Sequence, residues 1–213
     1  LGDKAAISMS FNNLGILAWF QGDNAMARDL YEKSLALRKE IGDRPGISQT
    51  LNNLGIVASA LGSHTEAQVL HEECLAIMRE TGNRPGASTS LCNLGQVAVE
   101  QGHFNRARAL YAESLTLAHT MGDKLLVLCN FVGGAAVAAG LGVAVRAVQF
   151  AAAAETLRVA INGTLPPIIR QQYERTITAT RAALGEEAFN AAWAVGSRWS
   201  LEEAVHEALQ KKT

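Results

Sequence analysis

The stretch that decides the fold is Leu51-Asn52-Asn53-Leu54-Gly55. It repeats Phe11-Asn12-Asn13-Leu14-Gly15 and returns as Leu91-Cys92-Asn93-Leu94-Gly95, a spacing of 40 residues each time. A fixed period of this size is typical of proteins built from stacked structural repeats. Other positions keep the same period: Gly22, Gly62 and Gly102; Ala27, Ala67 and Ala107; Leu30, Leu70 and Leu110; Gly42, Gly82 and Gly122.

Each 40-residue unit has the pattern of two helices. Apolar residues recur at helical spacing on both sides of Gly62, and Gly82, Asn83 and Pro85 supply the usual chemistry of a helix end followed by a new helix. Short connections of this kind make neighbouring helices antiparallel. We therefore predict helix pairs at 3–22/24–41, 44–61/64–81, 84–101/104–121 and 124–140/144–158.

The fourth unit departs from the pattern. Phe131-Val132-Gly133-Gly134-Ala135 stands in place of the repeated motif, and Ala151 to Ala154 replace bulkier residues. Terminal repeats are commonly atypical because one face packs on something else. Three further helices are predicted at 166–183, 186–196 and 200–211, the last opened by a Ser200-x-x-Glu203 capping box. We thus divide the chain into repeats at 1–158 and a C-terminal three-helix cap at 159–213.

The repeated residues resemble those of the tetratricopeptide repeat (TPR). Leu54-Gly55, Gly62 and Ala67-x-x-Leu70-His71-x-x-Cys74-Leu75 match its pattern, in the longer spaced variety of kinesin light chains and cell-polarity scaffolds. The likeness is close over about residues 8–122 and loose over 124–158. It implies an all-α, right-handed superhelical solenoid of antiparallel helix hairpins, with three regular repeats, a degenerate fourth and the cap. It also implies peptide or protein binding in a concave groove lined by the first helix of each hairpin.

The end of the chain is similar to a second group of proteins. Leu184-Gly185-Glu186, Ala192-Trp193-x-x-Gly196 and Leu201 to Leu209 resemble the TPR region of large bacterial signal-transduction ATPases of the LuxR and AfsR kinds. The resemblance implies a fragment of a bacterial signalling or transcription regulator. The chain opens on Leu1 in register with the end of a repeat, so we expect an excised piece of a longer protein.

Composition excludes several classes of function. The formal net charge is −1 and no basic cluster occurs, which argues against direct nucleic-acid binding. The three cysteines are far apart and form no C-x-x-C pair, as expected in a reducing cytoplasm. Residues 125–145 are apolar enough to raise a membrane-spanning alternative. Their Gly and Ala content, and their register with the earlier repeats, favour a soluble repeat.

Candidate binding residues follow from the register of the first helices. Polar and aromatic side chains predicted to face the groove are Asn12, Asn13, Trp19, Gln49, Asn52, Asn53, Asn93 and Gln96. An asparagine amide can both donate to and accept from a peptide backbone. The alternative is that the asparagines tie adjacent hairpins together. Arg44 and Arg84 recur at helix entrances, where they either bind acidic ligand groups or remain solvated.

No residue constellation indicates an enzyme, a cofactor or a metal site. His71-x-x-Cys74 places two ligands on one helix face, but a structural zinc site needs four. His71 also takes the position of Tyr31 and Tyr111, which is a packing position. Small residues at Gly15, Gly55 and Gly95 predict close helix contacts, and Gly55→Leu should cost about 1–3 kcal/mol by overpacking.

We therefore predict a non-catalytic module that binds a peptide, a partner protein or another domain of its parent chain. The alternative is a small-molecule-sensing region of a regulator, which a compact pocket with convergent polar groups would favour. Phe11, Leu14, Leu17 and Trp19 should be partly bare at the truncated N-terminal face, which could drive a non-native homodimer.

Overall fold

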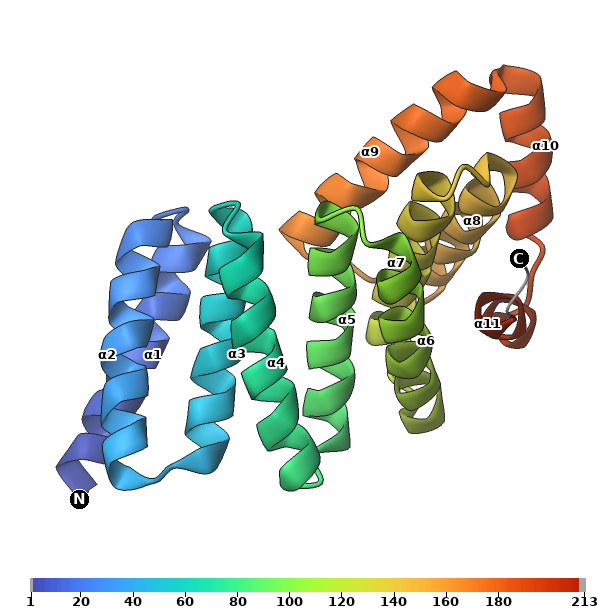
Figure 1. Ribbon diagram of the computed structural model, residues 1–213. Coiled ribbons are helices and arrows are strands. Elements are labelled where there is room, and N and C mark those ends of the chain that lie inside the picture. Colours follow the sequence, from blue (N-terminus) through green and yellow to red (C-terminus); the bar gives the residue numbers. More distant parts are fainter. Residues whose placement is uncertain (1, 211–213) are drawn as a thin grey trace. The chain divides into compact units, whose positions relative to one another are not determined.

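The computed structural model describes residues 2–210, and these form eleven helices and no strand. The prediction of an all-α fold of consecutive helix hairpins is confirmed. Figure 1 shows the helices along the chain. Their bounds are α1 Gly2–Phe20, α2 Asn24–Ile41, α3 Arg44–Ala60, α4 His64–Glu80, α5 Arg84–Glu100, α6 Phe104–Met121, α7 Lys124–Gly140, α8 Ala144–Ala160, α9 Pro167–Leu184, α10 Glu186–Gly196 and α11 Leu201–Leu209.

The connections between hairpins explain the constant period. Gly42 ends α2 in the left-handed region with φ 70°, a conformation in which a Cβ atom is strained. The Asp43 side chain then accepts a hydrogen bond from the Gly46 amide at 3.0 Å and so caps α3. Asn83 makes the same contact with the Gly86 amide at 2.9 Å. The same turn chemistry therefore ends one hairpin and begins the next.

The described residues fall into two compact units, unit 1 up to Val97 and unit 2 from Ala98. In unit 1, α1 packs on α2, α2 on α3 and α3 on α4. Ala18, Ala27 and Tyr31 of the first hairpin form one buried cluster with Leu54 and Val57 of α3. The repeated motif thus supplies the residues by which one hairpin packs on the hairpin before it.

Unit 2 joins α6, α7 and α8 to the three C-terminal helices. α9 packs on α7 and α8, α10 packs on α8, and α11 contacts α6 and α8. The alanines at 151–154 are all buried, so they give the later helices a flat surface to approach. Trp199 packs edge-on to Phe150 with ring centroids 5.8 Å apart, and Trp193 stacks on Phe189 at 5.8 Å. Trp193 and Trp199 also pack against the buried cluster of Ala135, Phe150 and Ala151, so both tryptophans anchor the C-terminal segment to α7 and α8.

The apolar stretch at 125–145 is divided between two helices. α7 ends at Gly140, Gly142 takes φ 78°, and α8 begins at Ala144. Within residues 2–210, no helix combines the length and the hydropathy needed to cross a bilayer.

Candidate functional site

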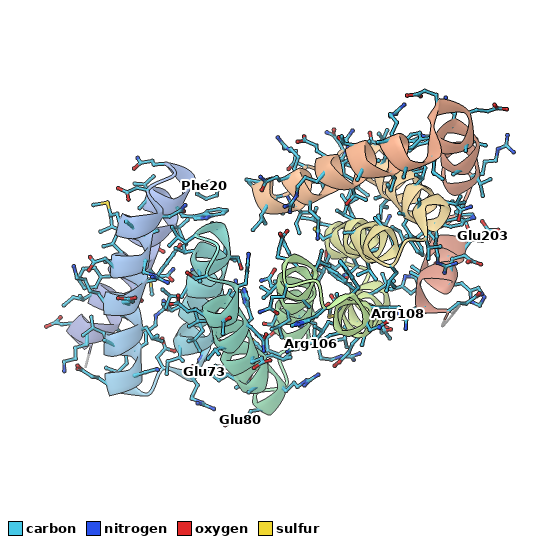
Figure 2. The ribbon with its side chains drawn as sticks, turned by 45° about the horizontal axis from the view of Figure 1, so that its top comes forward. Phe20, Glu73, Glu80, Arg106, Arg108 and Glu203 are labelled. Atoms are coloured by element: carbon cyan, nitrogen blue, oxygen red, sulfur yellow. The ribbon has the colours of Figure 1, made fainter. Side chains whose placement is uncertain are left out.

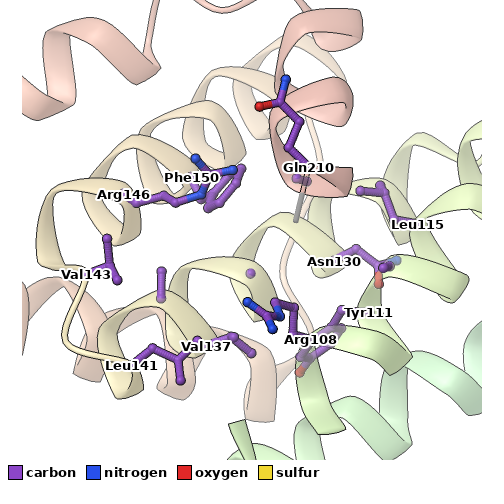
Figure 3. Close-up of a pocket in the computed structure, with 14 residues that line it drawn as sticks. Arg108, Tyr111, Leu115, Asn130, Val137, Leu141, Val143, Arg146, Phe150 and Gln210 are labelled. Carbon is purple, nitrogen blue, oxygen red and sulfur yellow. The ribbon is translucent and has the colours of Figure 1, made fainter. Parts of the chain in front are cut away.

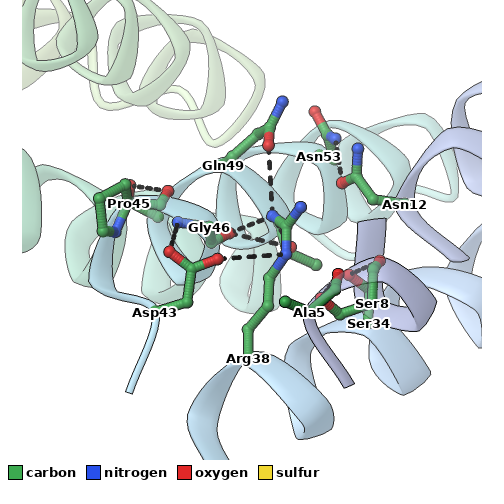
Figure 4. Close-up of polar contacts among 12 residues, drawn as sticks. Ala5, Ser8, Asn12, Ser34, Arg38, Asp43, Pro45, Gly46, Gln49 and Asn53 are labelled. Carbon is green, nitrogen blue, oxygen red and sulfur yellow. Dashed lines mark hydrogen bonds and ion pairs between the residues drawn. The ribbon is translucent and has the colours of Figure 1, made fainter. Parts of the chain in front are cut away.

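Two asparagine pairs join the first helices of successive hairpins in unit 1. The Asn53 Nδ2 group donates to Asn12 Oδ1 at 3.2 Å, as Figure 4 shows, and Asn93 Nδ2 donates to Asn52 Oδ1 at 2.9 Å. Each pair joins positions 41 residues apart. The second asparagine of one motif therefore binds the first asparagine of the motif before it, and the two pairs link α1, α3 and α5 in one register.

The pairs leave part of the amide chemistry free. Asn12 is buried at 1% exposure, whereas Asn52, Asn53 and Asn93 are partly exposed. The Asn53 Oδ1 atom accepts no hydrogen bond from the described residues, and one of its two N–H donors is also unused. A partially exposed amide with a free donor and a free acceptor matches the two polar groups of a peptide backbone.

A depression lies beside Asn53 between α1 and α3. Its volume is about 210 Å³, and it is open to solvent. The rings of Trp19 and Phe20 meet edge to face with centroids 5.0 Å apart, and Phe20 is 74% exposed at the end of α1 (Figure 2). The residues that line the depression are Ile16, Trp19, Phe20, Tyr31, Asn53 and Ile56. We call this feature the α1–α3 depression.

Gln49 takes part in a network centred on Arg38. The Arg38 guanidinium donates to Gln49 Oε1 at 3.2 Å, to Thr50 Oγ1 at 2.8 Å and to the Gly46 carbonyl oxygen (Figure 4). Arg38 is 4% exposed, and its burial lowers the pKa of the guanidinium although Asp43, 4.0 Å away, opposes this. Arg38 thus holds the first turns of α3 in place and orients the Gln49 side chain.

The remaining predicted residues lie apart from the depression. Arg44, at the start of α3, is ion-paired with Glu80 at the end of the antiparallel helix α4, so its charge is already partnered. Arg84 is exposed and has no carboxylate partner among the described residues. Gln96 is 5% exposed, and its Nε2 atom has no hydrogen-bond partner between residues 2 and 210. Asn13 is exposed on α1 and, unlike Asn53 and Asn93, makes no amide pair among the described residues.

Trp19 and Asn53 are therefore the two predicted residues that share the depression. Ile16, Phe20 and Ile56 of the same two helices also line the depression. The sequence did not predict that Tyr31 lines the depression or that Arg38 holds Gln49. Arg38 could have been found, because it is a charged residue at a position that Met78 and Ala118 occupy in the next two 40-residue repeats.

His71 and Cys74 are the two residues of unit 1 that the sequence raised as a pair of metal ligands. Within the described part of the chain, no group of three or more His, Cys, Asp and Glu side chains could hold a metal ion. Burial lowers the pKa of His71 to about 4, so its ring is neutral near pH 7. The Cys74 thiol donates to the Ser48 carbonyl oxygen at 3.2 Å, and burial raises its pKa. These groups act as packing residues.

Comparisons with known proteins agree with the fold. A family model described as "Tetratricopeptide repeat" matches residues 5–80 and 46–118. Among solved structures, the crystal structure of BtubC (BKLC) from P. vanneervenii superposes with a TM-score of 0.69 at 19% identity, covering 99% of this chain and 84% of that one. At this identity the likeness concerns the fold alone. None of the curated protein sequences matches the chain.

Proposed function

The chain belongs to the tetratricopeptide repeat family, and we propose that it binds a peptide or protein segment in the α1–α3 depression of unit 1. Proteins built from this repeat are generally non-catalytic interaction scaffolds. The observation that supports the proposal is an apolar, aromatic depression with a partly free amide beside it. An apolar side chain of the partner would fill the depression, while Asn53 would hydrogen-bond the partner's backbone.

The chemistry of the depression favours an uncharged, apolar anchor on the partner. No lining residue carries a formal charge, and the large side chains are aromatic or branched aliphatic. Trp19 and Phe20 offer rigid contact area, which is the chemistry that dominates binding hot spots. The Asn12–Asn53 bond keeps Asn53 at the edge of the depression, because Asn12 is held in the buried space between the hairpins.

The experiment is selection of peptides from a displayed library of random twelve-residue sequences against the whole chain. We expect the selected peptides to share an apolar or aromatic anchor and to lose roughly ten-fold or more in affinity on Ile56→Glu, which places a charge in the depression. Val69→Glu is the matched control, because Val69 is 57% exposed on α4 and does not line the depression. Equal affinity for the parent and Ile56→Glu would refute the assignment.

The outer face of α1 supports a second mode of partner binding, pairing with another copy of the chain. Ile7, Leu14 and Leu17 are 46%, 51% and 53% exposed, whereas their counterparts Ile47, Leu54 and Val57 are 6%, 5% and 0% exposed. Leu54 and Val57 are covered by the hairpin before them. No charged residue occurs between Lys4 and Asp23 to oppose contact between two such faces. We propose that two copies pair through this face, with Asn13 free to form amide pairs across it.

We further propose that the module is part of a larger bacterial signalling or transcription regulator in the reducing cytoplasm. The C-terminal residues that resemble such regulators support this, as do three buried cysteines that form no disulfide in the described part of the chain. The alternative function, small-molecule sensing, is supported by a separate observation, a pocket in unit 2 that polar and apolar side chains line together.

A further inference from the structure

Unit 2 contains a pocket that the peptide-binding proposal does not use. It lies between α6, α7 and α8, with the end of α11 as a further wall, and its cavity has a volume of about 80 Å³ and is open to solvent. Figure 3 shows Arg108 and Arg146 reaching toward it from different helices, with Asn130 on a third side. Val137, Leu141 and Phe150 give it a mainly apolar wall.

A single sequence change accounts for the space. Gly134 stands at the position of Leu54 and Leu94, which are 5% and 3% exposed and fill the gap between hairpins in the earlier repeats. A Cβ atom built on Gly134 would meet nothing nearer than the Phe150 ring at 3.8 Å, which is ordinary contact. The degenerate motif of the fourth repeat therefore opens a pocket where its counterparts are packed.

Asn130, one of the residues that line the pocket, has a side-chain acceptor without a partner elsewhere in the described chain. Asn130 is 3% exposed, and its Nδ2 group donates to Ser114 Oγ at 3.0 Å and to the Leu126 carbonyl oxygen at 2.8 Å. These two bonds fix the orientation of the amide. The Oδ1 atom is buried without a hydrogen-bond partner in the described residues. A buried, unpaired acceptor is costly, so a ligand that brings a hydroxyl or N–H donor would gain from it.

The rim carries one uncompensated positive charge. Arg146 is paired with Glu207 Oε2 at 3.2 Å, donates to the Glu207 carbonyl oxygen and lies 5.0 Å above the Phe150 ring. Arg108 has no carboxylate partner within the described part of the chain. An anionic group on a ligand would therefore meet the Arg108 guanidinium without displacing an existing ion pair.

We infer that this pocket binds an elongated organic acid with an apolar body and a separate hydrogen-bond donor. The apolar body would occupy the space left by Gly134, the donor would reach Asn130, and the acid group would pair with Arg108. The lining of α7 runs from Asn130 to Leu141, which at 1.5 Å per residue is roughly 16 Å. This inference rests on the small-molecule-sensing alternative and is independent of peptide binding in unit 1.

The test compares three probes on the whole chain by titration calorimetry: 10-hydroxydecanoate, decanoate and decane-1,10-diol. The first supplies acid, chain and donor, the second lacks the donor, and the third lacks the charge. We expect saturable one-to-one binding of 10-hydroxydecanoate, with each of the other two weaker by roughly five- to ten-fold. Absence of saturable binding for all three, or equal affinity for acid and diol, would overturn the inference.

Two variants connect the binding to this pocket. Gly134→Leu restores the residue of the earlier repeats and should abolish probe binding, while Gly134→Ala reports whether helix α7 tolerates a side chain. Arg108→Ala should remove the preference for the acid over the diol, whereas Lys124→Ala, an exposed cation outside the pocket, should not. Undiminished binding to a folded Gly134→Leu chain would place the probe elsewhere. Peptides selected in unit 1 should bind Gly134→Leu normally, so the two proposals can fail separately.

Discussion

Contacts between a glycine of one helix and a ring of the next determine how closely each hairpin of unit 1 closes. A Cβ atom built on Gly15 would lie 2.6 Å from the Tyr31 ring, and one on Gly55 would lie 2.5 Å from the His71 ring. Both rings are buried, so neither has free space to move into. The predicted close approach at Gly15 and Gly55 therefore has a specific cause, a ring seated against the facing backbone.

Two glycine-to-alanine substitutions in the middle of helices should change stability in opposite directions. Gly55→Ala is expected to lower the free energy of unfolding by about 1–3 kcal/mol, because the buried His71 ring must shift. Gly134→Ala meets only ordinary contact and should raise it by about 0.5–1 kcal/mol through reduced backbone entropy of the unfolded chain. Urea denaturation of both variants measures the difference, and equal effects would contradict the packing described for Gly55.

His71 should make the chain less stable in mild acid. Burial lowers the pKa of its ring from 6.5 to about 4, so between these pH values the unfolded chain binds more protons than the folded chain. The free energy of unfolding should therefore fall as the pH drops through this window, by up to about 3 kcal/mol, and His71 should contribute no pH dependence above it.

His71→Tyr provides the control for the acid effect. Tyr31 occupies the same position in the first hairpin, against Gly15, so a tyrosine has a suitable place to pack. Denaturation midpoints measured from pH 4 to pH 7 should vary less for this variant than for the parent. Parallel curves for the two proteins would mean that carboxylates alone cause the acid sensitivity.

The sequence predicted the positions of the polar side chains along the first helix of each hairpin, but not the hydrogen bonds between them. Asn12 and Asn53 lie where the register puts them, yet only the structure shows a bond between them that leaves Asn53 partly free. The position of Arg44 was also readable from the turn chemistry. Its ion pair with Glu80 was not, because that contact depends on how two antiparallel helices are aligned across 36 residues of chain. The binding role of these residues stays a prediction.

At the scale of elements, helix ends were the most predictable feature. Gly42, Gly82 and Gly122 all take positive φ as expected, and Ser200 and Glu203 form the predicted capping box. The packing of α9, α10 and α11 was harder to predict from the sequence, because these helices lie outside the 40-residue period. Gly196 illustrates the difficulty. A side chain there would collide with the Gln149 backbone of α8, and this contact cannot be predicted from the 40-residue period. The proposed boundary between repeats and cap at residue 158 stays a prediction.

The capping box should control the stability of α11. The Glu203 amide donates to Ser200 Oγ at 3.2 Å, and the Ser200 amide donates to Glu203 Oε2 at 2.8 Å, which lowers the pKa of the Glu203 carboxyl. Ser200→Ala removes the side-chain acceptor and should destabilise the helix by about 1 kcal/mol.

Hydrogen exchange of the amides at 201–209 is the measurement for this variant. Exchange should accelerate there and stay unchanged in α3, which has its own cap at Asp43. Ser197→Ala is the matched control, because Ser197 lies at the C-terminal end of α10 and its hydroxyl makes no hydrogen bond within the described residues. Unaltered exchange in α11 after loss of Ser200 Oγ would show that packing on α6 and α8 alone holds this helix.

At the scale of the whole molecule, the exposed face of α1 is the feature with the largest expected effect. If two copies pair through it, light scattering coupled to size-exclusion chromatography should show a mass that rises with protein concentration. Leu17→Glu places a charge in that face and should keep the chain monomeric. Val69→Glu, with similar exposure on α4, should leave the association intact. A monomeric parent chain at all concentrations would refute the pairing.

The matching junctions have a consequence for how such a gene can change. Gly42-Asp43 is followed by Arg44-Pro45-Gly46, and the same triplet recurs as Arg84-Pro85-Gly86. Excision of the codons for residues 44–83 would therefore join Asp43 to Arg84 and recreate the original turn. It would also bring Asn12 opposite Asn93, a donor of the same kind as Asn53. Recombination between neighbouring 40-residue repeats can thus shorten or lengthen the array and still leave a matching turn and a matching asparagine pair at the new junction.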